Sequence, residues 1–358
     1  MANDKPEKMI LTKSNLIESI TRRLRHSSEK RSADPSAVLD GNPAQIHLND
    51  FSEPIVIPLQ EFLQADFPTR IAVVLARLPR RPLSLQLSTA WFSILGKAAE
   101  LRLSQPQMHR LAEEAIALQP DSKFVDSLFE ILLDDGQERR GDVNEPVFFI
   151  ISCEKYLEKA VPLHHKLCKF HSRTFVVVGD PSVREAVVDG YKLIVPAGDA
   201  YEDLPKKVLE SLVFVRRKWK GSGVFKIDDD SEVIGPPNWE GISQMAREAQ
   251  FAGYVMTRTE DRPMDRCWHI GKCSHRDMTP YRGRYRGSYA AGASYYLGPI
   301  AVDTLVRDYF KYRDEFNIEL FEDKAIGSIL FQNGIEPRPA DIAGLLGLRI
   351  EEWVKELK

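Results

Sequence analysis

Val224–Asp230 reads VFKIDDD, a short apolar run that ends in three consecutive carboxylates. A helical pattern over 203–220 and the break Gly221–Gly223 precede it, which predicts a strand following a helix. In open α/β sheets, ligands bind at the edge formed by the carboxyl ends of the strands. Asp228 and Asp230 point the same way in an extended chain, so they can share one hard cation. A solvated acidic turn or a helix N-cap is the alternative interpretation.

Length and composition are those of a globular protein with room for two domains. The chain has 358 residues, is 43% hydrophobic and 28% charged, and has a formal net charge of −3. This charge gives no overall attraction to nucleic acid or to an anionic membrane. No apolar run is long enough to span a membrane, and Met1–Lys13 lacks the apolar core of a secretory signal. We therefore expect a cytoplasmic protein whose four cysteines are thiols.

The first part of the chain has a helical pattern. Residues 1–50 are polar and weakly patterned, and we expect them to be partly disordered. Helical periodicity separated by Pro or Asp-Ser breaks follows, in the segments 59–66, 69–78, 84–102, 106–118 and 122–134. The last two segments resemble one tetratricopeptide-type hairpin, and no second copy follows. The sequence therefore predicts a small all-α domain over 1–140, which would bind a protein partner or position an acceptor.

Strands and helices alternate after residue 147. We predict strands at 147–152, 174–179, 192–195 and 224–227, with helices at 154–170, 183–189 and 203–219 between them. This order indicates a mostly parallel sheet covered on both faces, in a domain over 145–340. Ser152, Gly179, Pro196 and Asp228 then share one rim of the sheet.

The second half of this domain contains a further strand at 251–256 and a helix at 299–312. Glu322 and Asp323 open the next predicted helix, where the helix N-terminus favours ionised carboxylates. These two acids are either functional groups or ordinary N-terminal capping residues. A C-terminal helix over 341–358, with its amphipathic part at 348–357, closes the predicted fold.

Residues 258–288 are rich in Arg, Gly, His and Tyr and are predicted to form a functional loop or lid. Four zinc-ligand types lie in it, Cys267, His269, Cys273 and His275, but their spacing matches no common zinc finger. We favour a lid in which Trp268 stacks on a sugar. The interleaved Arg and Tyr residues are also typical of single-strand nucleic-acid binding. Because the net charge is negative, we prefer an anionic donor or acceptor to nucleic acid.

Four motifs in order give a resemblance to a known family. They are YEDLPKK at Tyr201–Lys207, KIDDD at Lys226–Asp230, GASY at Gly292–Tyr295 and EDKAIG at Glu322–Gly327. With them, residues 147–331 resemble the catalytic domain of glycosyltransferase family 31, the β-1,3-galactosyltransferases and Fringe-like enzymes. The absence of a membrane anchor favours a bacterial-type member.

The resemblance implies a Rossmann-like GT-A fold, a UDP-sugar donor, Mn²⁺ or Mg²⁺, and inversion at the anomeric carbon. It assigns the metal to Asp230, places Asp228 near the ribose or the metal, and makes Asp323 the catalytic base. It also places the donor beside other residues that match the motifs or lie on the sheet rim, namely Ser152, Lys207, Asp229, Gly292 and Glu322. Trp268 of the predicted lid would stack on the donor's sugar. The cation would neutralise the UDP leaving group, and the base would take the proton of the attacking hydroxyl.

The sequence departs from the family pattern at three points. Asp203 replaces the usual Asn, and Ser294 replaces the last Gly of the Gly-rich segment. The family's metal-binding His after the Glu-Asp pair is missing, since no His follows His275. Either Asp, phosphates and water hold the cation, or the lid supplies His269 or His275, or the domain is inactive.

We therefore expect an inverting, metal-dependent enzyme that moves a hexose or N-acetylhexosamine from a UDP-sugar to a glycan hydroxyl. The acceptor would be a glycan or a lipid-linked glycan in bacterial surface polysaccharide synthesis, in the cytoplasm or at the inner-membrane surface. One alternative is a nucleotidyltransferase, which also uses strand-end acids and a metal. The other is a non-catalytic helical-repeat scaffold that carries a degenerate GT-A domain.

Overall fold

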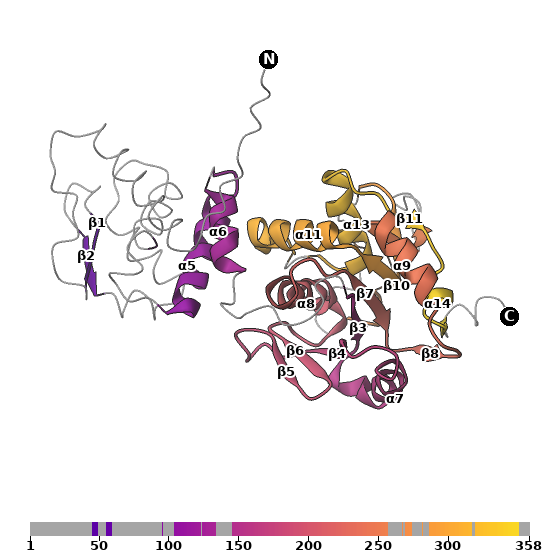
Figure 1. Cartoon of the computed structure of the whole chain (residues 1–358). Coiled ribbons are helices and arrows are strands. Elements are labelled where there is room, and N and C mark those ends of the chain that lie inside the picture. Colours follow the sequence, from indigo (N-terminus) through magenta and orange to yellow (C-terminus); the bar gives the residue numbers. More distant parts are fainter. Residues whose placement is uncertain are drawn as a thin grey trace, which may run out of the picture. The chain divides into compact units, whose positions relative to one another are not determined.

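The computed structural model divides the chain into two compact units, Met1–Asp135 and Gly136–Lys358 (Figure 1). It describes residues 45–48, 55–58, 95, 104–122, 124–133, 145–256, 267, 269–273, 281, 286–316 and 319–350. The predicted helices at 59–66 and 69–78 lie outside this part of the chain, and of 84–102 only Leu95 is described.

In the first unit, the described residues include two packed helices and a small sheet. The predicted helices at 106–118 and 122–134 are confirmed as α5 (Gln105–Leu118) and α6 (Val125–Leu132). Ser104 is the N-cap of α5, and its backbone N–H donates to the Gln107 side chain at 2.8 Å, as in a capping box. β1 (Gln45–Leu48) and β2 (Ile55–Pro58) pair antiparallel and were not predicted. An all-α first domain therefore remains a prediction.

The second unit is built on one mixed, mostly parallel sheet of eight strands. In chain order they are β3 (Val147–Ile151), β4 (Thr174–Gly179), β5 (Val187–Asp189), β6 (Lys192–Val195), β7 (Val224–Asp228), β9 (Phe251–Met256), β10 (Tyr289–Leu297) and β11 (Arg338–Pro339). Their spatial order is β11-β9-β10-β7-β3-β4-β6-β5. β7, β3, β4 and β6 run parallel, whereas β10 is antiparallel to both β7 and β9. The predicted α/β architecture is confirmed, and it is compatible with a Rossmann-like domain.

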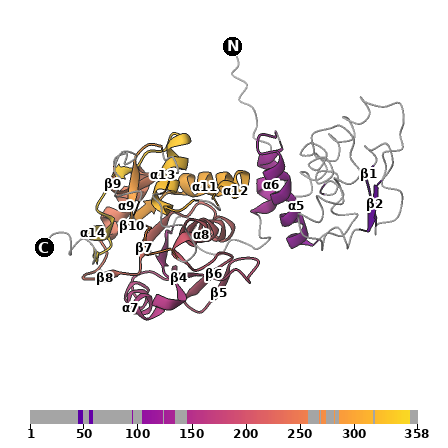
Figure 2. The ribbon, with the colours of Figure 1, turned by 180° about the vertical axis from the view of Figure 1, so that it is seen from behind.

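Helices cover both faces of this sheet (Figures 1 and 2). One face packs against α7 (Leu157–Leu167), α9 (Trp239–Glu248) and α14 (Ile342–Leu345). Its core includes Phe148, Ile150, Phe225 and Ile227. The other face packs against α8 (Leu204–Lys218), with α11 (Pro299–Lys311) and α13 (Glu322–Gln332) beside it.

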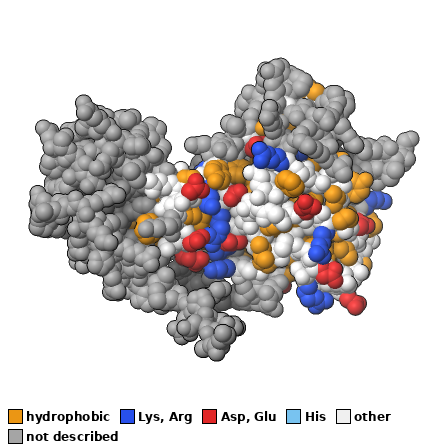
Figure 3. Space-filling model, turned by 90° about the horizontal axis from the view of Figure 1, so that it is seen from above, with side chains coloured by type: hydrophobic (Ala, Val, Ile, Leu, Met, Phe, Trp, Pro, Cys, Tyr) orange, Lys and Arg blue, Asp and Glu red, His pale blue; other side chains and the backbone are white. Residues whose placement is uncertain are grey.

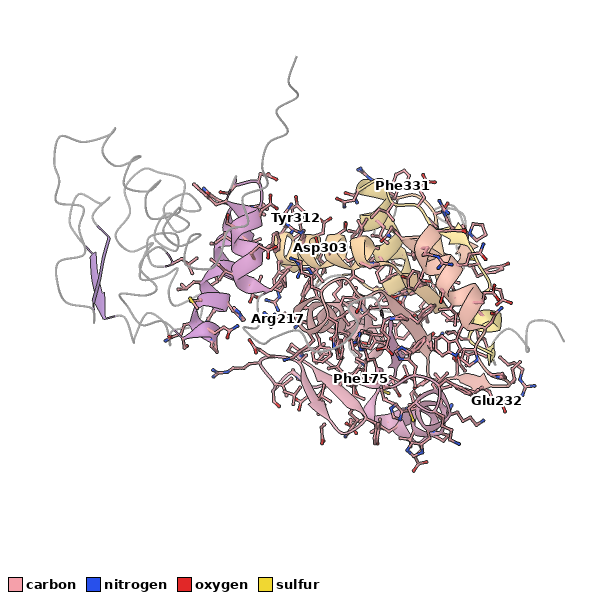
Figure 4. All side chains as sticks on the ribbon, in the orientation of Figure 1. Phe175, Arg217, Glu232, Asp303, Tyr312 and Phe331 are labelled. Atoms are coloured by element: carbon pink, nitrogen blue, oxygen red, sulfur yellow. The ribbon has the colours of Figure 1, made fainter. Side chains whose placement is uncertain are left out.

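Strand alternation decides which face carries the polar groups of β7. Phe225 and Ile227 lie in the core under α7, so Lys226 and Asp228 point to the face covered by α8 and α13. Ion pairs hold the helices of that face together. Arg216 of α8 donates from Nε to Asp303 of α11 at 2.5 Å, and Figure 4 shows Asp303 above α8.

Two predicted helices are wrong. The predicted helix at 183–189 does not form, and Val187–Asp189 is instead the edge strand β5, which pairs antiparallel with β6. Of the predicted C-terminal helix over 341–358, the described residues up to 350 form a helix only in α14, since Gly347 has a positive φ of 64° and breaks it. Leu348–Ile350 then forms β12, which alternates buried and exposed residues and pairs with β8 (Ser231–Val233). Residues 351–358 lie outside the described chain.

Candidate functional site

The acid triplet lies at the switch point of the sheet. From β3 the chain continues to β4 and β6 on one side, and then crosses to β7 on the other side. In sheets of this kind the carboxyl ends of the two central strands flank the ligand crevice. Ser152 follows β3, and its hydroxyl donates to Oδ2 of Asp229 at 2.6 Å. The structure thus brings Ser152 and the triplet together, as the sequence predicted.

A buried lysine neutralises part of this acidic cluster. Lys226 is 1% exposed, and its Nζ lies 2.5 Å from Oδ1 of Asp228 and 3.8 Å from the carboxylate of Glu322. It also donates to the carbonyl of Gly292. Burial raises the pKa of Asp228 to about 6, although the ammonium of Lys226 opposes the shift. Burial by itself would lower the pKa of Lys226. The carboxylates of Asp228 and Glu322 act more strongly in the other direction, so the pKa of Lys226 is raised.

The other two acids of the triplet have different environments. Burial raises the pKa of Asp229, while its hydrogen bond from Ser152 acts in the opposite direction. Oδ1 of Asp230 is buried and has no hydrogen-bond partner among the described residues. A buried acceptor without a partner is costly unless a cation or water satisfies it. Asp230 is therefore the carboxylate best placed to accept a metal ion.

The predicted acidic pair at the start of α13 joins the same cluster. Glu322 is 3% exposed and accepts a hydrogen bond from the Tyr295 hydroxyl, and burial raises its pKa to about 7. Asp323 accepts from the backbone N–H of Lys324 at 2.8 Å and of Gly292 at 3.2 Å. Burial raises the pKa of Asp323, so it outweighs the effect of the helix N-terminus that we expected to favour the ionised form.

Lys207 belongs to a separate network behind the rim. Its Nζ donates to the carbonyl of Ser152 at 2.8 Å and to Oδ1 of Asp199 at 2.6 Å. Asp199 also accepts from the backbone N–H groups of Gly179 at 2.8 Å and of Glu154 at 2.7 Å. These contacts fix the loops after β3 and β4. Lys207 supports the rim through Ser152, and its place beside the donor, which the resemblance implies, stays a prediction.

Sequence reasoning missed Asp199, Tyr201 and Tyr295. Asp199 could have been found from its acidic side chain in the loop after β6. That loop begins with Pro196, which the sequence had already placed on the rim. Tyr201 lies in η2 (Tyr201–Asp203), where burial and the negative charges of Asp323 and Asp228 raise its pKa. Both tyrosines were part of quoted motifs, but neither aromatic ring gave a sign of chemistry by itself.

The predicted lid is described only in part. Trp268 and His275 lie outside the described residues, so the four-residue zinc set and the stacking of Trp268 remain predictions. The His269 ring lies 5.7 Å from that of Phe321, beside the start of α13. The segment 269–273 also reaches Tyr201, where the Lys272 ammonium lies 5.7 Å from the ring centroid. Part of the predicted lid thus lies beside the acid cluster.

Within the described part of the chain, no three His, Cys, Asp or Glu residues are arranged to hold a metal ion by themselves. The acid triplet nevertheless suits a hard cation that arrives with phosphates. Asp230 offers an oxygen without a hydrogen-bond partner among the described residues, and Asp228 is two residues away on the same strand end. Mg²⁺ is usually bound by one or two carboxylates together with substrate phosphates and water. Asp228 and Asp230 therefore fit a divalent cation that is bound together with phosphates.

A groove of about 480 Å³ lies elsewhere, between α9, β11 and α14. Its lining includes Asn238, Met245, Arg338 and Leu345, and none of the acid-cluster residues. Asn238 already caps α9 by accepting from Gly241. We therefore base the candidate site on convergent chemistry, not on this cavity.

No protein-family model matches this chain, and no similar sequence is found among curated proteins. None of the helices that the structure describes is both long enough and apolar enough to cross a bilayer.

Proposed function

We propose that this protein is a metal-dependent, inverting glycosyltransferase of GT-A type that uses a UDP-sugar donor. The observation that carries the proposal is the convergence of motif residues far apart in the chain. Lys226 contacts Asp228, Gly292 and Glu322, and Gly292 donates to Asp323. Three of the four segments that resemble family 31 thus meet through hydrogen bonds and ion pairs.

The fourth segment supports the same conclusion. Tyr201 lies close enough to Asp323, Asp228 and Glu322 for their charges to raise its pKa. All four segments therefore surround the carboxyl end of β7, next to the switch point. A scaffold with no ligand has no need for a cluster of carboxylates whose pKa values are raised, whereas functional sites commonly contain them.

The residues take distinct roles in the proposed transfer. Asp230, with Asp228 beside it, would hold the cation. When bound, that cation would neutralise the charge that develops on the UDP leaving group. Asp323 would accept the proton of the attacking hydroxyl, and its raised pKa makes the ionised form a stronger base than an ordinary aspartate. Ser152 would hold Asp229 at the edge of the donor site.

The proposed acceptor is a glycan or a lipid-linked glycan of a bacterial surface polysaccharide, reached from the cytoplasm or the inner-membrane surface. The first unit would bind a protein partner or position that acceptor. On the face shown in Figure 3, Lys and Arg side chains lie beside Asp and Glu side chains. Among the described side chains of that face, this mixture gives no broad basic footprint of the kind that binds nucleic acid.

The proposal is tested by titration calorimetry of UDP with Mn²⁺ and with EDTA. Without a cation the carboxylates at 228–230 repel a diphosphate, so we expect UDP to bind far more tightly when Mn²⁺ is present. Asp230→Ala should remove most of this metal dependence. Asp189→Ala is the matched control, because it removes one exposed carboxylate on β5, away from the acid cluster. Equal UDP affinity with and without metal would contradict the proposed site.

Product analysis separates the two kinds of transferase. A screen of UDP-sugars with Mn²⁺ should release UDP from one of them. Release of pyrophosphate from a nucleoside triphosphate, without turnover of any UDP-sugar, would instead support a nucleotidyltransferase.

A further inference from the structure

The acid cluster already contains a cation of its own. Lys226 and Asp228 lie two residues apart on β7, so their side chains share one face of the sheet. The ammonium contacts Asp228, the carbonyl of Gly292 on β10 and the carboxylate of Glu322 on α13. A buried charge persists only when partners compensate for lost hydration, and these three groups supply that compensation. Lys226 thereby joins three elements of the site.

This arrangement limits what the triplet offers to a metal ion. Oδ1 of Asp228 is engaged by Lys226, and Oδ2 of Asp229 is engaged by Ser152. Oδ1 of Asp230 remains without a hydrogen-bond partner among the described residues. An ammonium beside Asp228 also repels a second cation, and this repulsion is stronger near a protein interior than in water. The protein without nucleotide therefore presents a poor site for a free divalent cation.

We propose that Lys226 makes cation binding dependent on the diphosphate, so that the metal ion and the nucleotide bind together. This inference rests on the proposed function and adds the order of binding at the same site. A diphosphate brings several oxygen ligands and further negative charge. It thereby replaces the negative charge of the triplet that Lys226 neutralises. Lys226 is thus a positioning residue that holds Asp228 in place and prevents the acids from capturing a cation alone.

The experiment measures Mn²⁺ binding by titration calorimetry, first to the protein alone and then with UDP present. Wild-type protein should bind Mn²⁺ weakly alone and much more tightly with UDP. Lys226→Met keeps most of the side-chain volume and removes the charge, which frees Asp228 to act beside Asp230. We expect this variant to bind Mn²⁺ alone about tenfold more tightly, because affinity follows the number of charged ligands.

Two control variants show whether a change in Mn²⁺ affinity comes from the charge of Lys226 or from a loss of structure. Lys226→Arg keeps the positive charge and should bind Mn²⁺ alone as weakly as the wild type. Arg349→Met removes a positive charge from the exposed pair with Glu232 and should also leave Mn²⁺ binding unchanged. A purely structural role for Lys226 predicts loss of folding without any gain in affinity for Mn²⁺.

Circular dichroism establishes whether each variant is folded. If Lys226→Met does not fold, Lys226→Met with Glu322→Gln removes the carboxylate that would be left without its buried partner, and the same gain is expected. A folded variant that binds Mn²⁺ no more tightly than the wild type overturns the inference, as does wild-type protein that binds Mn²⁺ equally well without UDP. Failure of UDP to bind would instead refute the proposed function, while the comparison with Mn²⁺ alone still tests Lys226.

Discussion

Asp323→Asn should abolish most catalysis while the protein stays folded and binds UDP normally. Asp323 lies at the start of α13 and is the proposed base, whereas the metal ligands lie at the end of β7. The substitution keeps the shape of the side chain and removes its ability to accept a proton. General-base catalysis is typically worth about 10²–10⁴-fold in rate, so we expect a loss in that range.

Two opposing effects keep the change in stability small. The carboxylate accepts two backbone hydrogen bonds, from Lys324 and Gly292, and Asn can accept only one of them with its single oxygen. A lost hydrogen bond to a charged group costs about 1.5–3 kcal/mol. Burial disfavours the ionised carboxylate, as its raised pKa shows, and neutral Asn relieves that cost. We expect a net change near 1 kcal/mol, which lowers Tm by about 2–4 °C for a domain of this size.

The assay is UDP release from the active UDP-sugar, measured together with UDP affinity and Tm. Asp308→Asn is the matched control, because burial also raises the pKa of Asp308, which lies on α11 and accepts from Asn333. Its rate should equal that of the wild type. A purely capping role predicts a different pattern for Asp323→Asn, since Asn caps helices nearly as well as Asp. Transfer at the wild-type rate would remove Asp323 from the mechanism.

Two further predictions concern the rim and the pH dependence. Asp199→Ala leaves the buried ammonium of Lys207 without its carboxylate, so the free energy of unfolding should fall by about 3–5 kcal/mol, as measured by urea denaturation. An unchanged midpoint would show that this network does not support the rim. Metal-dependent UDP binding should weaken as the pH falls through the pKa of Asp228, about 6, because the protonated acid no longer attracts the cation. Asp228→Asn should flatten this pH dependence in calorimetry, and an equally steep profile would assign it to another group.

The sequence predicted the second unit well where apolar runs were long and unbroken. The buried strands β3, β4 and β7 and the helix α8 follow from composition and periodicity alone. It failed at β5, because the three residues Val187–Asp189 are too few to distinguish a strand from a helical turn. β12 was missed for a related reason, since its pairing with β8 depends on a partner more than a hundred residues earlier in the chain.

At the candidate site too, the sequence predicted the residues that the strand order places and missed the contacts that depend on tertiary packing. Asp228, Asp229 and Ser152 follow strands, so the topology alone places them at one edge. Glu322 and Asp323 reach that edge only because α13 packs against α8 and β10, which no local pattern reveals. The contacts of Lys207 with Asp199, and of Tyr295 with Glu322, likewise depend on tertiary packing.

Lys226 shows how a residue with an ordinary sequence signal becomes central in the fold. Within VFKIDDD it is a single charged residue in an apolar run, yet it contacts Glu322 of α13 and is only 1% exposed. Its charge is retained because Asp228 and Glu322 lie beside it, and the buried carboxylate of Glu322 would be costly without it. The stability of the acid cluster and its affinity for cations therefore depend on the same ammonium. A substitution that frees the acids for metal binding must also weaken the packing that positions them.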